Sequence, residues 1–160
     1  MFFATSPDDL PSRDKVLSMS GMAFMEAVRD GRQAGPPIGR LMNCRVSEVD
    51  PGRVVFTGTP GFDHMNPVGG IHGGWYGTVL DSCMGCAVMT KVAQGSIYTT
   101  LEYKININRA IPAGTDILAT GWVVHAGRST AVAHGEIRNA KDDTLYASGS
   151  TTCLIMAIPG

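Results

Sequence analysis

The part of the chain with the greatest potential for chemistry is a glycine-rich loop that leads into an apolar helix. Residues 66–74 read NPVGGIHGG, and Asp81 is the one ionisable carboxylate in the helical segment that follows. A carboxylate among apolar neighbours is costly to desolvate, so it needs either a partner or a function. Asp81 is suited to activating a water as a general base or to attacking an acyl carbon as a nucleophile. The alternative is a structural Asp bonded to the backbone or to a threonine hydroxyl.

Gly73 and Gly74 lie where the predicted helix begins, near His72. Backbone N–H groups in a first helical turn have no partner within the helix, and the helix dipole is positive at this end. Glycine also lacks the Cβ that would keep a ligand carbonyl at a distance. The two amides are therefore candidates for stabilising the oxyanion of an acyl-transfer reaction. Two glycines that permit a tight turn into the helix are the alternative, and both interpretations can hold together.

The spacing between Gly73 and Asp81 limits how they can act together. Eight residues separate them, which is about 12 Å along a helix. Two groups that far apart cannot both contact one reacting carbonyl. We therefore expect the site to combine Gly73 of one subunit with Asp81 of another. A two-fold homodimer would contain two such shared sites.

The elements that must hold these groups follow from the hydrophobic pattern. Residues 72–92 are apolar on nearly all sides, which is typical of a helix buried in the centre of a domain. Strand-like segments at 40–49 and 54–59 precede it, and four more, at 97–107, 116–125, 129–139 and 144–156, follow it. Their short connections favour an antiparallel meander. The order predicts an α+β fold in which an antiparallel sheet wraps one long central helix. An extra amphipathic helix is predicted over 18–32, after a loosely ordered lead-in over 1–15.

Composition argues against several classes of protein. The chain has 160 residues, 44% hydrophobic and 17% charged, which suits one packed domain. A net charge of -1 without a long basic run argues against binding to nucleic acid or to an anionic membrane. The sequence lacks a secretory signal pattern and a bilayer-spanning apolar segment, so we expect a cytoplasmic protein. Cys83 and Cys86 form a C-x-x-C pair without further ligands at metal-binding spacing, so we interpret them as core residues and expect no metal site.

The pattern Asn-x-x-Gly-x-x-His-Gly-Gly followed by a helical Leu-Asp, which runs here from Asn66 to Asp81, resembles acyl-CoA thioesterases with the hotdog fold. The resemblance is to the phenylacetate-type (PaaI-like) branch, which includes the Arthrobacter-type 4-hydroxybenzoyl-CoA thioesterase. Residues 99–112 also match the third strand of that family, although Pro112 follows three residues after Arg109 where the family has Arg-Pro. The implied organisation is an N-terminal lead-in and helix over 1–38 and a hotdog thioesterase domain over 39–158.

The resemblance implies hydrolysis of an acyl-CoA thioester without a cofactor. Asp81 would be the base or nucleophile, and the Gly73 amide would polarise the thioester carbonyl with Gly74 beside it at the substrate. Asn66 would help to place the water or the thioester, and His72 would fix the loop or the helix start. The family further implies a homodimer that assembles into a dimer of dimers.

Four further positions complete the predicted site. Thr100 matches a Ser or Thr that positions substrate or water in relatives, and Thr99 competes with it because the register is defined only to one residue. Arg109 and Arg128 are candidates for binding the phosphates of coenzyme A, or else are solvated loop arginines.

Two other functions stay open at this point. A non-catalytic acyl-CoA-binding hotdog module would bind ligand without turnover, and a hotdog enoyl-CoA hydratase would use a catalytic His in a different arrangement. The acyl group is also open, because the larger apolar side chains suit either an aryl or medium-length acyl pocket or the core, namely Trp75, Tyr76, Met84 and Phe62.

Overall fold

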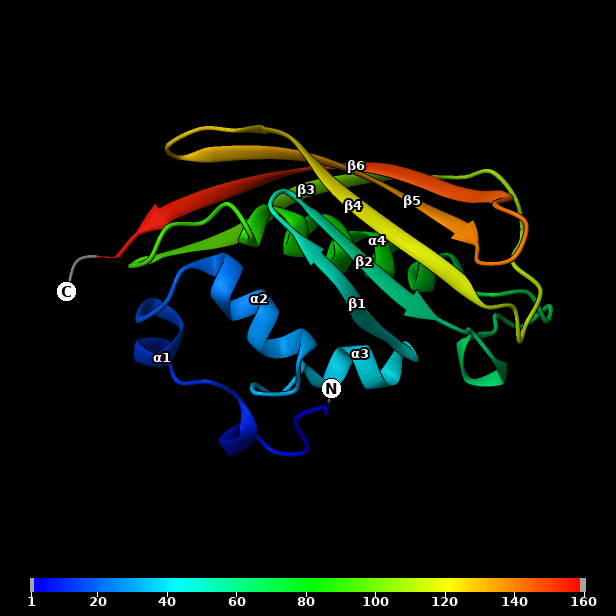
Figure 1. The fold of residues 1–160 in the computed structure, drawn as a ribbon. Coiled ribbons are helices and arrows are strands. Elements are labelled where there is room, and N and C mark those ends of the chain that lie inside the picture. The colour runs from blue at the N-terminus through cyan, green and yellow to red at the C-terminus, as the bar shows by residue number, and fades with distance from the viewer. Residues whose placement is uncertain (1, 159–160) are drawn as a thin grey trace.

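A six-stranded antiparallel sheet curves around one long helix, α4 (Gly73–Met89), in the computed structural model of the protein (Figure 1). The structure describes residues 2–158, so Met1, with which the predicted lead-in begins, lies outside them. The curved sheet and the central helix confirm the predicted α+β hotdog architecture with an extra N-terminal helix. The strands are β1 (Cys44–Asp50), β2 (Arg53–Gly58), β3 (Ser96–Ile107), β4 (Ile117–Ala126), β5 (Thr130–Asn139) and β6 (Leu145–Ala157).

The strand order is β1-β2-β4-β5-β6-β3, so the predicted simple meander is wrong. Of the four strands after α4, only β4, β5 and β6 follow one another as neighbours. After α4 the chain re-enters the sheet at the far edge, where β3 pairs with β6 rather than with β4. The chain then returns to fill the gap beside β2. This arrangement leaves β3 as an edge strand, alongside the central helix.

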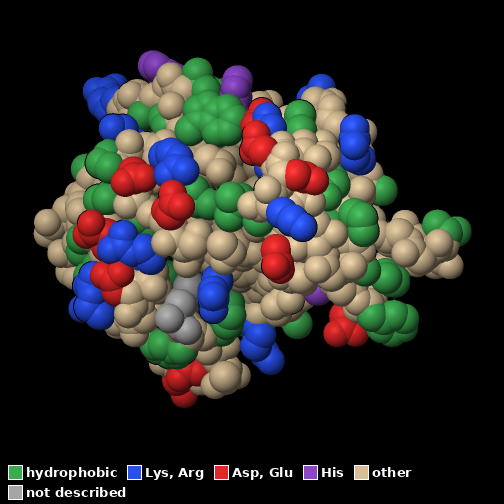
Figure 2. Space-filling view, turned by 45° about the vertical axis from the view of Figure 1, so that its right-hand side comes forward, with side chains coloured by type: hydrophobic (Ala, Val, Ile, Leu, Met, Phe, Trp, Pro, Cys, Tyr) green, Lys and Arg blue, Asp and Glu red, His purple; other side chains and the backbone are tan. Residues whose placement is uncertain are grey.

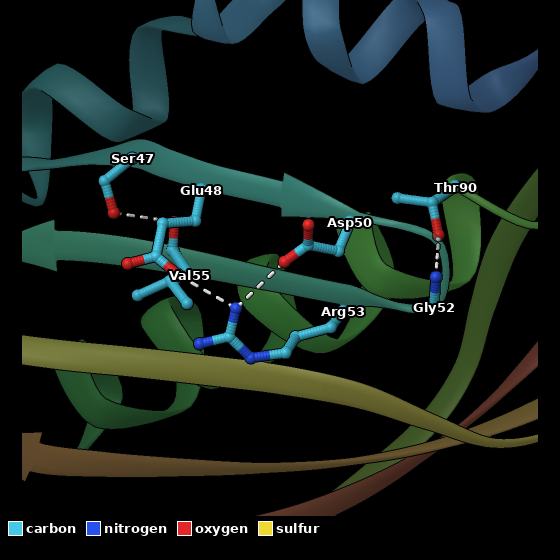
Figure 3. A network of polar contacts seen from close by, with 7 residues as sticks. All are labelled: Ser47, Glu48, Asp50, Gly52, Arg53, Val55 and Thr90. Atoms are coloured by element: carbon cyan, nitrogen blue, oxygen red, sulfur yellow. Dashed lines mark hydrogen bonds and ion pairs between the residues drawn. The ribbon is translucent and has the colours of Figure 1, made fainter.

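The central helix is buried on nearly every side, as its all-round apolar sequence predicts. Val79, Leu80 and Cys83 are fully inaccessible to solvent. At its C-terminal end, Thr90 accepts a hydrogen bond from the Gly52 N–H at 2.7 Å and donates to the Ala87 carbonyl. Figure 3 shows that this bond joins the helix to the β1–β2 turn. The bond therefore attaches the β1–β2 hairpin to the C-terminal end of α4.

A row of three glycines crosses the sheet where α4 packs on it. Gly121 of β4 is paired with Gly135 of β5, which is paired with Gly149 of β6. A Cβ at Gly121 would collide with the backbone of Cys83, and one at Gly135 would lie 2.7 Å from Met84 Cγ. The absence of side chains therefore lets the helix approach the sheet closely.

Replacing Gly121 with alanine should destabilise the fold by about 3 kcal/mol, since the added methyl meets helix backbone that cannot move aside easily. The measurement is the urea midpoint of unfolding at constant m-value. Gly61→Ala is the matched control, because no atom lies within 4 Å of a Cβ built there. A Gly121 variant as stable as this control would show that the glycine row does not set the helix position.

Residues 2–43, here called the N-terminal addition, pack below α4 and beside β1 (Figure 1). The addition contains two short helices besides the predicted one: α1 (Arg13–Leu17) and α3 (Pro37–Leu41). The predicted amphipathic helix is α2 (Gly21–Arg29), and Ser20 caps it. The lead-in is thus more ordered than predicted. The first strand begins later than residue 40 because a proline pair starts α3 instead.

Charged side chains of both signs are interleaved on the face shown in Figure 2, and the described residues on that face form no broad basic area. Within residues 2–158, no helix has both the length and the apolarity that crossing a bilayer requires.

Candidate active site

The loop before α4 is closed by hydrogen bonds from its own residues. The Asn66 Oδ1 accepts from the N–H groups of Val68 at 3.0 Å and Gly70 at 3.1 Å. The Asn66 N–H donates to the Gly70 carbonyl at 2.8 Å, and Gly69 adopts a φ of +83° that favours glycine. The Asn66 Nδ2 has no hydrogen bond to another of the described residues. Asn66 therefore shapes the loop and keeps its amide nitrogen available.

His72 is the N-cap of α4. The ring Nδ1 of His72 accepts a hydrogen bond from the Gly74 N–H at 2.9 Å, and the backbone N–H of His72 donates to the His64 carbonyl at 2.8 Å. The His64 side chain in turn bridges the Gly61 N–H and the Leu41 carbonyl. The start of the helix is thus tied through two histidines to α3. This role of His64 was not predicted, because the Leu41 carbonyl that its side chain contacts lies 23 residues earlier in the chain.

The two glycine amides at the helix start are not equivalent. The Gly74 N–H is occupied by His72, so it is not free to bind an oxyanion in this structure. The Gly73 N–H has no acceptor among residues 2–158, and Gly73 is exposed. Of the two predicted oxyanion donors, only the Gly73 N–H is therefore free to bind a ligand.

Asp81 lies in the middle of α4, half-buried, and faces β3. Its Oδ1 accepts a hydrogen bond from the Thr100 hydroxyl at 3.0 Å. Thr99 is exposed, so the register of β3 selects Thr100 of the two candidates. The Asp81 Oδ2 has no hydrogen bond within the described residues. One carboxylate oxygen is thus anchored and the other is available for chemistry.

Replacing Thr100 with valine should lower kcat for thioester hydrolysis about tenfold with little change in KM, because Asp81 loses the hydroxyl that orients it. Thr99→Val is the matched control, one residue away and exposed. Steady-state kinetics on a thioester that the protein hydrolyses measure the difference. Equal kcat values for the two variants would remove Thr100 from the site.

The site residues lie in two groups at different levels of α4. A Cβ at Gly73 would lie 3.5 Å from Ile107, whereas Asp81 contacts Thr100, so α4 and β3 run past one another in opposite directions. Arg109 follows the Gly73 end of β3. Arg128 precedes β5. The first residues of β5 pair with β6 opposite the part of β3 that contains Thr100, so Arg128 lies toward the end of β3 that is near Asp81. One chain therefore brings Asp81 and Thr100 together, but it does not bring Gly73 to Asp81 or Arg109 to Arg128.

A largely apolar cavity of about 440 Å³ reaches Asp81 from the side of the N-terminal addition. The larger apolar residues considered for an acyl pocket do not line it. Trp75, Tyr76 and Met84 are buried in the core, with the Trp75 Nε1 donating to the Met42 carbonyl and the Tyr76 hydroxyl accepting from the Ile111 N–H. Phe62 is 84% exposed.

The C-x-x-C cysteines lie in the core of the fold. Burial raises the pKa of the Cys83 thiol strongly. Burial, with a smaller contribution from the Asp81 charge, raises the pKa of Cys86 to about 12. Both thiols are therefore protonated at neutral pH and poor nucleophiles. Within the described part of the chain, no group of three His, Cys, Asp or Glu side chains is placed to hold a metal ion.

Comparison with known proteins agrees with this geometry. A family model described as the thioesterase superfamily matches residues 68–146, a range that contains Gly73, Asp81 and Thr100. No curated protein sequence matches the chain.

Solved structures share the fold over most of their length. The zebra fish thioesterase superfamily member 2 is 27% identical, with a TM-score of 0.69 over 86% of this chain and 99% of that one. A thioesterase family protein from Silicibacter pomeroyi is 25% identical, with a TM-score of 0.73 over 84% of this chain and 98% of that one. A mutant of the phenylacetic acid degradation protein PaaI from Thermus thermophilus, 24% identical, has a TM-score of 0.68 over 74% of this chain and 97% of that one.

The site lies on the helix and loop that the family model covers, and the surrounding fold is that of these solved thioesterases. The chain therefore has the hotdog fold of these solved proteins, and its residues 68–146 match the thioesterase superfamily.

Proposed function

We propose that the protein hydrolyses an acyl-CoA thioester to the free acid and coenzyme A, in active sites shared between two subunits. The observation that carries the proposal is the half-anchored carboxylate of Asp81, which lines an apolar cavity within a thioesterase-superfamily domain. A carboxylate held in one orientation, with a free oxygen beside an apolar cavity, is suited to activating a water or attacking a carbonyl.

The exposed edge of β3 supports the shared site. On the edge strand β3, whose one partner among the described strands is β6, Leu101 is 58% exposed, Tyr103 46% and Ile107 48%. Such an edge is a template for pairing with a second copy of the chain. When two antiparallel strands pair, the residue numbers of facing residues add up to the same total. A two-fold axis between residues 103 and 104 would therefore place Ile107 of one subunit opposite Thr100 of the other.

That register would join the two separated groups. Ile107 lies beside Gly73, and Thr100 is bonded to Asp81. The Gly73 amide of one subunit would thus approach the Asp81 carboxylate of the other across the paired strands. The same pairing would bring Arg109 of the first subunit and Arg128 of the second to one end, where their charges would suit the phosphates of coenzyme A.

The chemistry follows from the two groups. The Gly73 N–H, at the positive end of α4, would stabilise the oxyanion that forms when the thioester carbonyl is attacked. In the general-base route, Asp81 takes a proton from water, the hydroxide adds to the carbonyl carbon, and the C–S bond breaks as the thiolate leaves with that proton. In the nucleophilic route, the Asp81 oxygen adds first, the C–S bond breaks and the coenzyme A thiolate leaves; water then hydrolyses the mixed anhydride, which releases the acid, returns the Asp81 carboxylate and supplies the proton of the thiol. Both routes use the free Oδ2.

The test is a panel of aryl and aliphatic acyl-CoAs, with release of free thiol as the readout. We expect turnover of at least one apolar acyl-CoA by the purified protein. Tight binding of acyl-CoA without any thiol release would contradict the proposal and favour a binding module. Hydration of an enoyl-CoA in its place would indicate a hydratase.

A further inference from the structure

We propose that the N-terminal addition forms the outer wall of the acyl pocket, and that α2 sets the length of the apolar acyl group that the enzyme accepts. The inference rests on the proposed thioesterase function and adds a specificity element outside the region that the family model matches. Its basis is the cavity of about 440 Å³, which lies between the addition and the hotdog core and reaches Asp81.

Helix α2 provides one wall of this cavity. Phe24, Met25 and Val28 line it, and their spacing of one, three and four residues places them on one face of the helix. Met25 and Val28 are almost fully buried, at 3% and 4% exposure. The apolar face of α2 is therefore shared between packing and the cavity.

The opposite wall comes from the catalytic layer of the fold. Cys86 and Met89 of α4 and Tyr98 of β3 line it, one and two helical turns beyond Asp81 or on the adjacent strand. A substrate carbonyl held at Asp81 would therefore have its acyl group directed between α4 and α2. A cavity of this volume is in the range that binds small organic ligands.

The polarity of the lining specifies the class of acyl group. Asp81 is the one acidic lining residue and Arg45, which is exposed, the one basic residue. The Ser82 hydroxyl is already bonded to the Thr78 carbonyl at 2.7 Å. Tyr98 stays neutral because burial raises the pKa of its hydroxyl. A lining that is mostly apolar suits an alkyl or phenylalkyl group and disfavours a charged one.

The wall is attached to the hotdog core at the junction between α1 and α2. The Gly21 N–H donates to the Val92 carbonyl at 2.9 Å, and the Gly95 N–H donates to the Leu17 carbonyl at 3.0 Å. A Cβ at Gly21 would collide with the Met89 carbonyl, so the start of α2 lies directly against the end of α4. A wall attached in this way limits the depth of the cavity rather than yielding to a longer chain.

The experiment changes the depth of the cavity in both directions and measures kcat/KM on a series of straight-chain acyl-CoAs. Val28→Phe should fill the cavity and lower kcat/KM for the longer substrates at least about tenfold relative to butyryl-CoA. Phe24→Ala should deepen it and move the optimum to longer chains. Val124→Phe, an equal substitution on the exposed end of β4, should leave the profile unchanged.

A second readout separates this inference from the thioesterase function. A dansyl-labelled undecanoic acid should bind the Asp81→Asn protein, and binding should weaken about tenfold when Val28→Phe is added. The native protein could hydrolyse acyl-CoAs while all variants keep its length profile and probe affinity. That result would contradict the proposed role of the N-terminal addition and leave the proposed thioesterase function intact. If no acyl-CoA is hydrolysed but Val28→Phe still weakens binding of the probe, the proposed thioesterase function is contradicted. The proposal that α2 forms a wall of the binding cavity is then kept. Misfolding cannot mimic the result, because Phe24→Ala and Val28→Phe shift the profile in opposite directions.

Discussion

Asp81→Asn should reduce kcat for thioester hydrolysis by at least about 100-fold, since proton transfer or attack by a positioned carboxylate contributes on this scale. Asparagine has nearly the same shape, and its Oδ1 can still accept the bond from the Thr100 hydroxyl. The variant keeps the orientation of the side chain and loses only the charge and basicity. Its KM should therefore change little, because the cavity that holds the acyl group is intact.

The stability of the same variant gives a second expectation. Asp81 is half-buried among apolar residues and has a single hydrogen-bond partner among the described residues, so its charge is a cost to the fold. The unfolding free energy of Asp81→Asn should therefore equal or exceed that of the native protein, the usual sign of a residue kept for function. Asp14→Asn, an exposed substitution in α1, is the control that should change neither quantity. An Asp81→Asn protein with native kcat would exclude the carboxylate as the catalytic group.

The parts of the fold that could be predicted from sequence are those defined by local periodicity. The apolar pattern of residues 72–92 identified α4, and the alternating segments identified all six strands. The order of the strands could not be read in this way, because β3 pairs with residues about fifty positions later in β6. Such pairing depends on how the helix divides the sheet, which short connections do not reveal.

The candidate site was predicted where it depends on chain spacing and missed where it depends on side-chain geometry. The eight-residue separation of Gly73 and Asp81 stands unchanged, since both lie in one continuous helix. That the His72 ring occupies the Gly74 amide depends on a rotamer that no sequence pattern specifies. The apolar face of α2 was visible in the sequence, but its contact with the cavity depends on the path of the whole N-terminal addition.

Gly73→Pro should reduce kcat by about 100-fold or more while the fold is kept, because it removes one N–H and little else. Proline is favoured at the first position of a helix, where its missing N–H has no intrahelical partner. His72 before it is extended, at φ -62° and ψ 137°, as a residue preceding proline requires. Gly73→Ala is the matched control, because it adds a Cβ at an ordinary 3.5 Å from Ile107 and keeps the N–H. Equal losses in the two variants would indicate a steric effect and remove the amide from the mechanism.

Combining the two inactive variants tests whether one active site is built from two chains. The two proteins, Asp81→Asn and Gly73→Pro, are produced together with different tags and the mixed dimer is purified through both tags. In that dimer, one site has the native Gly73 of the first chain and the native Asp81 of the second, while the other site lacks both groups. The mixed dimer should recover about half of the native activity, since two-fold symmetry gives two equivalent sites. If Gly73 and Asp81 acted within one chain, each chain would still lack one of them, and the mixed dimer would be as inactive as its parents.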